Sequence, residues 1–163
     1  MSSLLDPTRR VVLQRVARAE VRVDGEVIGR IGQGAVLLVG IEVGDTESDV
    51  DVGAAKITKL RFFPGATPMD RTLAEVSGGC LVISQFTLAG SVRKGNRPSF
   101  TGAEEPVRAE ALYQRFAAQL ATSGLPVQTG RFGADMQVEL VNDGPVTLLL
   151  RVLEGAVLGA ERL

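Results

Sequence analysis

Asn142-Asp143-Gly144-Pro145-Val146-Thr147 separates two apolar segments, residues 136–141 and 148–153, and the fold depends on how this stretch is interpreted. Asp-Gly between apolar residues is typical of a β-hairpin turn, so the local sequence favours two strands joined here. Pro145 weakens this interpretation, because proline cannot donate a hydrogen bond to a strand ladder. A Gly-Pro bond can be cis, and a cis bond would aim the neighbouring carbonyl groups in directions that a trans peptide cannot reach. The alternative is therefore that this stretch is a rigid segment whose main-chain groups recognise a ligand.

Composition limits the functions that are open to this chain of 163 residues with a net charge of −1. The length favours one domain with a sizeable core. Histidine is absent, which excludes Ser-His-Asp and Cys-His catalysis and any zinc site with histidine ligands. The single cysteine, Cys80, excludes an internal disulfide and a Cys-rich metal site, and its apolar neighbours indicate a buried strand. An enzyme of this composition must move protons with a carboxylate, a lysine, a hydroxyl, the main chain or the substrate.

Location and charge give further expectations. No apolar run approaches the roughly 20 residues of a membrane span, and the amino terminus lacks the apolar region of a cleavable signal peptide. A single cysteine suits a reducing compartment, so we expect a cytoplasmic protein. The chain has 18 basic and 19 acidic residues, which argues against a general nucleic-acid coat but allows a local basic patch.

Hydrophobic periodicity predicts one α+β domain over residues 10–153, with a flexible tail at 1–9 and a second tail at 154–163. Two helices are expected. One begins at a Thr46 cap and runs to about Leu60, and the other begins at Pro106 and ends before Gly124. We expect a mostly antiparallel, curled or barrel-like sheet with both helices on one side. The predicted strands cover residues 10–16, 19–23, 26–31, 35–41, 61–63, 81–88, 127–129, 136–141 and 148–153.

Polar residues recur at positions where strands are usually apolar, in residues 14–16, 84–88 and 142–147. Each stretch has a simple structural explanation by itself. Thr87 is a good strand former, and its neighbours Ser84 and Gln85 can face solvent.

The loop of residues 90–102 carries Arg93, Lys94 and Arg97 among glycines. Such a loop is either simply solvated or a contact for phosphate or RNA.

Together these stretches resemble the D-aminoacyl-tRNA deacylase family, or D-tyrosyl-tRNA(Tyr) deacylases, of the bacterial and eukaryotic type. The resemblance runs in the correct order from about Arg10 to about Val152, and the pairing of Ser-Gln-Phe-Thr with Gly-Pro-Val-Thr is highly specific. The matching strings are Leu13-Gln14-Arg15-Val16, Ser84-Gln85-Phe86-Thr87-Leu88, Gly95-Asn96-Arg97-Pro98-Ser99-Phe100, Arg131-Phe132-Gly133-Ala134-Asp135-Met136-Gln137 and Val141-Asn142-Asp143-Gly144-Pro145-Val146-Thr147.

The resemblance implies a homodimer with its active site at the subunit interface. A cis Gly144-Pro145 motif would reach from one subunit into the active site of the other. The resemblance also implies catalytic and binding roles for individual residues. The implied catalytic residues are Ser84, Gln85, Phe86 and Thr87; the implied substrate-binding and chiral-selection residues are Gly144, Pro145, Arg15 and Met136; and the implied tRNA-binding residues are Arg93, Lys94 and Arg97.

The implied reaction is hydrolysis of the ester between a D-amino acid and the 3′-terminal adenosine of tRNA, without a metal or organic cofactor. L-aminoacyl-tRNA would be rejected, whereas glycyl-tRNA would be accepted, because glycine has no side chain to exclude. Main-chain N–H groups near Phe86 and Thr87 would stabilise the oxyanion, and the 2′-hydroxyl of the substrate would help to move a proton. Thr87 is either a nucleophile or an orienting group. We favour orientation, because an unassisted threonine hydroxyl is a weak nucleophile.

Two other classes of function are compatible with the same residues. In the first, the chain is a non-catalytic nucleic-acid-binding β-barrel whose contact surface is the loop that holds Arg93, Lys94 and Arg97. In the second, it is a dimeric interaction module. A deacylation assay distinguishes both from the enzyme.

Overall fold

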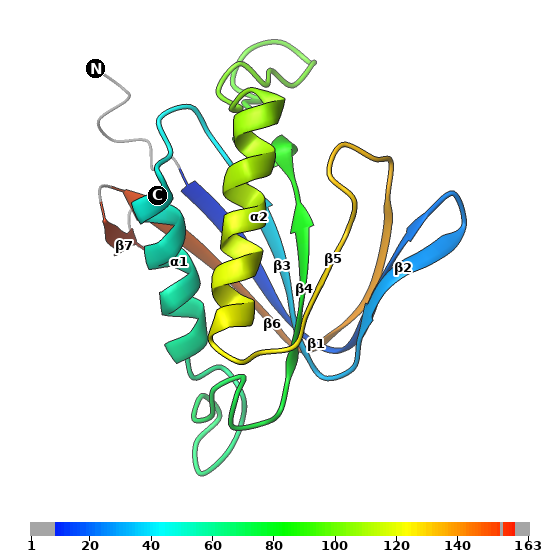
Figure 1. The fold of residues 1–163 in the computed structure, drawn as a ribbon, viewed down its shortest axis with the longest axis vertical. Helices are drawn as coiled ribbons and strands as arrows, with labels where there is room; N and C mark the ends of the chain where they lie inside the picture. The colour runs from blue at the N-terminus through cyan, green and yellow to red at the C-terminus, as the bar shows by residue number, and fades with distance from the viewer. Residues whose placement is uncertain (1–8, 154, 159–163) are drawn as a thin grey trace.

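A strongly curved β-sheet forms the body of the computed structural model, which describes residues 9–153 and 155–158 (Figure 1). Within these residues the strand order is β5-β4-β3-β1-β6-β7, and β2 pairs with the carboxyl-terminal part of β1, residues 19–23. The strands are β1 (Arg9–Val23), β2 (Glu26–Ile31), β3 (Gly34–Gly40), β4 (Gly79–Ser84), β5 (Val127–Thr129), β6 (Gln137–Leu153) and β7 (Ala156–Leu158).

Two α-helices are present in the described residues, α1 (Glu47–Lys59) and α2 (Pro106–Thr122), and both lie on the same face of the sheet (Figure 1). The Thr46 side chain caps α1 by accepting the N–H of Asp49, as the sequence predicts. None of the described helices is both long and apolar enough to cross a membrane.

The curled sheet with helices on one side is confirmed, but its strand directions are mixed. β1 is antiparallel to β2, β3 and β6, and β6 is antiparallel to β7, whereas β3, β4 and β5 run parallel. The reason is that α1 connects β3 to β4 and α2 connects β4 to β5. A strand-helix-strand crossover returns the chain to the sheet in the same direction.

The expected hairpin at residues 142–147 is wrong, because these residues lie within one long strand, β6. Both halves of β6 pair with β1. The pairing passes from Gln14 with Thr147 to Val16 with Asn142, so that four residues of β6 lie opposite Arg15 alone. The result is a wide bulge in a continuous strand. The length of β1 overrides the local turn signal, because it provides a partner for each apolar half of β6.

Three other element boundaries differ from expectation. β4 ends at Ser84, and the residues expected to continue it form a 3-10 helix, η2 (Phe86–Ala89). The expected strand at residues 61–63 is reduced to a single bridge between Phe63 and Arg71. Part of the expected carboxyl-terminal tail forms β7, whereas residues 1–8, 154 and 159–163 lie outside the described part of the chain.

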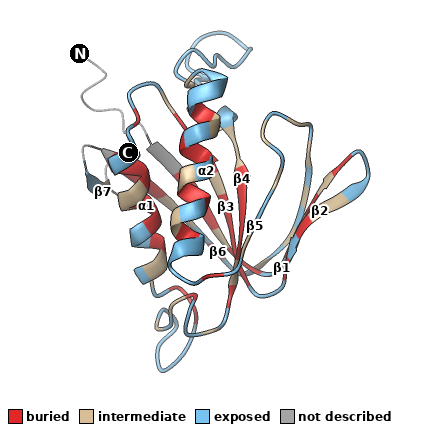
Figure 2. Ribbon diagram, in the orientation of Figure 1, coloured by how far each residue is buried: buried red, intermediate tan, exposed pale blue. Residues whose placement is uncertain are grey.

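Apolar side chains form two clusters, one on each face of the sheet. The larger cluster lies beneath the helices and includes Phe62, Phe63 and Phe116. The smaller cluster includes Val16 and Leu81 and fills the inner side of the curl. Figure 2 shows β3 and β4 buried along most of their length, as expected for central strands covered on both faces.

Candidate active site

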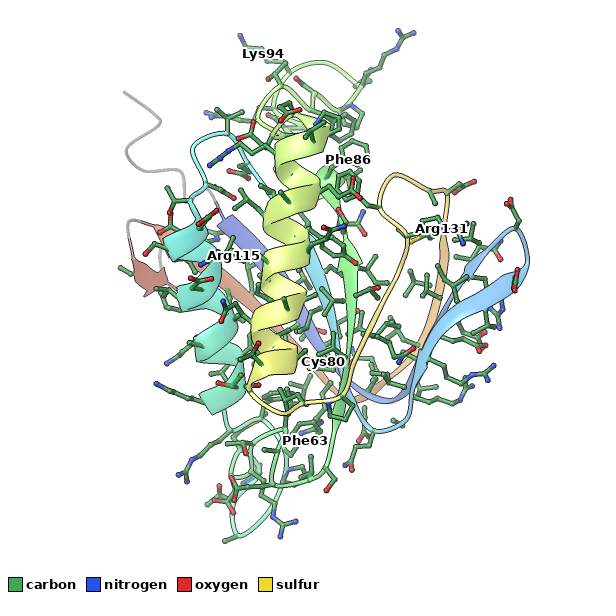
Figure 3. All side chains as sticks on the ribbon, in the orientation of Figure 1. Phe63, Cys80, Phe86, Lys94, Arg115 and Arg131 are labelled. Carbon is green, nitrogen blue, oxygen red and sulfur yellow. The ribbon has the colours of Figure 1, made fainter. Side chains whose placement is uncertain are left out.

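A cavity of about 460 Å³ lies at the carboxyl end of β4, beside the amino-terminal end of α2. Its volume is within the range of roughly 300–1,000 Å³ that is typical of ligand sites. Figure 3 shows Phe86 just beyond the end of β4 and Arg131 on the connection from β5 to β6. The residues that line the cavity are Ile41, Ile83, Ser84, Gln85, Phe86, Ala103, Glu104, Pro106, Ala109, Phe132, Gly133, Ala134, Met136 and Val138.

The predicted catalytic stretch forms one wall of this cavity. The N–H of Gln85 donates to the carbonyl of Val39 at 2.8 Å, after which the chain leaves the sheet and enters η2. The side-chain amide of Gln85 then donates to the Thr87 hydroxyl. Thr87 is exposed and, unlike Ser84, Gln85 and Phe86, is not among the residues that line the cavity. Phe86 packs edge-on against Phe100 with ring centroids 5.2 Å apart.

The N–H groups of Phe86 and Thr87 are suited to bind a negatively charged oxygen. They open a short helix, and the first N–H groups of a helix have no acceptor within it. No hydrogen bond joins either group to an acceptor in the part of the chain that the structure describes. Two such donors near an exposed hydroxyl are the components of an oxyanion hole.

The opposite wall comes from the connection between β5 and β6 and includes the predicted residue Met136. A Cβ atom added to Gly130 would lie 2.6 Å from the Met136 sulfur, so glycine at this position leaves room for the methionine. Phe132 belongs to the same wall, and its ring centroid lies 6.1 Å from that of Tyr113. Burial raises the pKa of Tyr113 to about 12, and its hydroxyl donates to the Val82 carbonyl at 2.8 Å. Tyr113 therefore supports the wall as a neutral side chain.

Of two further residues that chemistry alone could suggest, Cys80 does not line the cavity and Glu104 does. Cys80 is fully buried in β4, and burial raises the pKa of its thiol to about 12, so it is not a nucleophile at neutral pH. Glu104 lines the cavity, although the sequence indicates only an acidic residue near the start of α2. The sequence offers no signal for this position, because the cavity is made from four segments that lie apart in the sequence.

Arg15 holds the bulge of β6. Its side chain is buried, its Nε donates to the Asp143 carbonyl at 3.0 Å, and its Nη1 donates to the Phe62 carbonyl at 2.8 Å. Gly144 has φ +127°, and a Cβ atom there would lie 2.8 Å from Arg15 Nη2. Both its backbone conformation and its surroundings therefore require glycine.

The rest of the bulge is also tied by hydrogen bonds. Asn142 accepts the N–H of Val146 at 3.2 Å and donates to the Thr147 hydroxyl at 3.1 Å. The Gly144–Pro145 bond is cis, and both residues are exposed. They are not among the residues that line the cavity of the same chain, so the structure does not bring this motif to Ser84 and its neighbours within one chain.

The predicted tRNA contacts lie on the long loop before α2. Arg93, Lys94 and Arg97 are exposed, and none of the three forms an ion pair with another described residue. Figure 3 shows Lys94 at the outer end of this loop, beyond the amino terminus of α2 and on the same side of the molecule as Phe86. The loop is therefore a free basic surface near the cavity.

Comparison with known proteins agrees with this fold. A family model described as D-Tyr-tRNA(Tyr) deacylase matches residues 12–151. The chain belongs to this family.

Individual relatives cover nearly the same part of the chain. A D-aminoacyl-tRNA deacylase from Ruegeria pomeroyi is 51 % identical over 144 residues, covering 88 % of this chain and 99 % of that protein. A protein of the same name from Sorangium cellulosum is 56 % identical over 143 residues, covering 86 % and 95 %.

Two solved structures are also similar. One, described as c-Myc DNA Unwinding Element Binding Protein, has a TM-score of 0.82 and 39 % identity, and the match covers 88 % of this chain and 99 % of that one. The other, described as a probable eukaryotic D-amino acid tRNA deacylase, has a TM-score of 0.74 over 87 % and 98 % of the two chains. At 19 % identity, this second similarity shows the fold alone.

Proposed function

We propose that this protein hydrolyses the ester bond of D-aminoacyl-tRNA and releases the D-amino acid and free tRNA. The observation that carries the proposal is a cavity of about 460 Å³ with Ser84, Gln85 and Phe86 on its wall, in a chain of the D-Tyr-tRNA(Tyr) deacylase family. Relatives that share about half of their residues with it are named D-aminoacyl-tRNA deacylases.

The proposed chemistry uses the main chain and the substrate. The ester carbonyl lies against the N–H groups of Phe86 and Thr87, which stabilise the oxyanion formed when water attacks. The adjacent 2′-hydroxyl of the terminal adenosine moves a proton or positions that water. Thr87 orients the ester: its hydroxyl already accepts a hydrogen bond from Gln85, and no described carboxylate or amine is bonded to it to remove its proton.

Chiral selection is proposed to come from a second copy of the chain. The Gly144–Pro145 motif is exposed, braced by Arg15 and separate from the cavity of its own chain, and these features suit insertion into the cavity of a partner. Rigid carbonyl groups placed where an L side chain must lie would reject L-aminoacyl-tRNA without contacting a D side chain. Glycyl-tRNA would be hydrolysed, because it has no side chain to reject. Met136 would contact the substrate from the opposite wall.

The tRNA is proposed to approach across the basic loop. Arg93, Lys94 and Arg97 are free to contact phosphates next to the acceptor end, while the rest of the chain offers no basic excess. A cytoplasmic location and a reaction without a cofactor complete the proposal.

The test is a deacylation assay with the same tRNA charged with a D-amino acid, its L enantiomer or glycine, with a chelator present. We expect rapid release from the D ester, release from the glycyl ester and survival of the L ester. Comparable hydrolysis of the D and L esters would contradict the chiral mechanism. Tight tRNA binding without release from any of them would instead support a non-catalytic nucleic-acid-binding protein.

A further inference from the structure

Glu104 is the only ionisable side chain among the described residues that line the cavity. Its side chain is 12 % exposed, which is unusual for a carboxylate. The remaining walls are mostly apolar, with Phe132 and Met136 on one side and Ile41 and Pro106 on others. A carboxylate in such a cavity distinguishes ligands by whether they present a hydrogen-bond donor to it.

The backbone around Glu104 is held firmly to the end of β3. Its N–H donates to the Ile41 carbonyl at 3.1 Å, and the preceding residue, Ala103, forms an isolated bridge with Glu42. These contacts join two parts of the chain that are about 60 residues apart, and they fix the backbone of Glu104 beside the end of β3, where its side chain lines the cavity.

The Glu104 carboxylate can accept further hydrogen bonds. Its Oε1 accepts the N–H of Glu105 at 2.9 Å, and its Oε2 accepts Nε of Arg108 at 3.0 Å. An ionised carboxylate offers about four acceptor positions, so about two remain for a ligand. The ion pair with Arg108 does not by itself explain the burial of Glu104, because the Arg108 side chain is 48 % exposed and also donates to the Asp45 carbonyl.

We propose that Glu104 accepts a hydrogen bond from the exocyclic 6-amino group of the 3′-terminal adenine, and so makes the cavity specific for this base. The proposal rests on the proposed function, which supplies the substrate. A flat base suits the apolar walls, and its amino group supplies the donor that the lone carboxylate needs. Guanine carries an acceptor oxygen at the same ring position, which the carboxylate repels.

The α-ammonium group of the amino acid is the other candidate donor, but it suits this position less well. An ammonium group carries three N–H donors, and a cavity with one ionisable acceptor and mostly apolar walls leaves such a group poorly paired. An exocyclic amino group on an aromatic ring needs fewer partners and remains neutral.

Equilibrium binding tests the proposal without requiring turnover. The probe is a non-hydrolysable 3′-(D-aminoacyl)amino-3′-deoxyadenosine, and its partner is the same compound with a purine base that lacks the 6-amino group. Wild-type protein should bind the adenine probe roughly tenfold to a hundredfold more tightly, the range for a hydrogen bond to a charged group. Glu104→Ala should bind both probes alike, and Glu104→Gln, which keeps a carbonyl acceptor, should retain part of the preference.

Glu105→Ala is the matched control. Glu105 carries the same charge one residue away, but its carboxylate caps α2 by accepting the N–H groups of Val107 and Arg108, and it does not line the cavity. This variant should keep the full preference for the adenine probe even if its melting temperature falls. With D-aminoacyl-tRNA, Glu104→Ala should raise KM and leave kcat nearly unchanged, because the base lies away from the reacting ester.

Equal binding of the two probes by wild-type protein would overturn the proposal, as would equal loss of preference in Glu104→Ala and Glu105→Ala. A third probe with an acetylated α-amino group identifies the rival. If acetylation weakens binding to wild-type protein but not to Glu104→Ala, the carboxylate binds the α-ammonium group and the adenine assignment is wrong. Hydrolysis of D-aminoacyl-tRNA by the wild-type protein is measured separately, so its failure would reject the proposed function without deciding the role of Glu104.

Discussion

Arg15→Ala is the substitution that best separates a structural role from a role in chiral selection. The change removes two hydrogen bonds from a buried guanidinium, one to the Asp143 carbonyl and one to the Phe62 carbonyl. Each bond to a charged group contributes roughly 1.5–3 kcal/mol, so about 6 kcal/mol is an upper limit. Because Asp143 is exposed and water can replace one bond, we expect a loss of about 2–4 kcal/mol in the free energy of unfolding.

Such a variant should stay folded at 25 °C, since small domains have unfolding free energies of about 5–15 kcal/mol. The bulge that contains Gly144 would nevertheless lose the hydrogen bond from Arg15 to the Asp143 carbonyl. A displacement of about 1 Å in a reactive site commonly changes rates by about a hundredfold. We therefore expect the ratio of kcat/KM for D- over L-aminoacyl-tRNA to fall about tenfold to a hundredfold.

The measurement is single-turnover hydrolysis of matched D and L substrates at a temperature at which circular dichroism shows the variant fully folded. Arg18→Ala is the control, because Arg18 lies on the same strand and, among the described residues, its side chain pairs only with Glu139, in an exposed ion pair of 3.6 Å. Arg18→Ala should change neither stability nor selectivity appreciably. A folded Arg15→Ala protein that keeps wild-type selectivity would refute the reasoning.

Three other variants test separate parts of the proposal. Gly144→Ala places a side chain against Arg15 in a backbone conformation with φ +127°. It should therefore lower the free energy of unfolding by about 1–3 kcal/mol and weaken the rejection of L esters. An unchanged melting temperature and unchanged selectivity would contradict this. Neutralising Arg93, Lys94 and Arg97 together should raise KM and flatten the dependence of kcat/KM on salt, whereas an unchanged salt slope would place the tRNA contact elsewhere. Thr87→Ala should keep a substantial part of the wild-type rate, while substrate ending in 2′-deoxyadenosine should react far more slowly; an inactive Thr87→Ala protein together with a trapped acyl-enzyme in the wild type would establish a nucleophile instead.

The sequence by itself determined the elements whose signals are local. Alternation and an Asp-Gly turn predict β2 at residues 26–31, where the structure has it. A threonine cap and apolar residues at helical spacing predict α1 nearly to its last residue. The absence of histidine likewise limits the chemistry without any structure. These inferences succeed because the interactions that decide them lie within a few residues of one another.

Only the tertiary structure decided the features that depend on distant partners. Residues 142–147 have the local signature of a hairpin, yet they form a bulge, because β1 pairs with β6 on both sides of Arg15. Glu104 has the local signature of a helix terminus, yet it lines a cavity, because its backbone is bonded to Ile41. In both cases the deciding contact joins residues that are tens to more than a hundred positions apart. No local periodicity or capping pattern records such a contact, so the geometry of the site had to come from the folded chain.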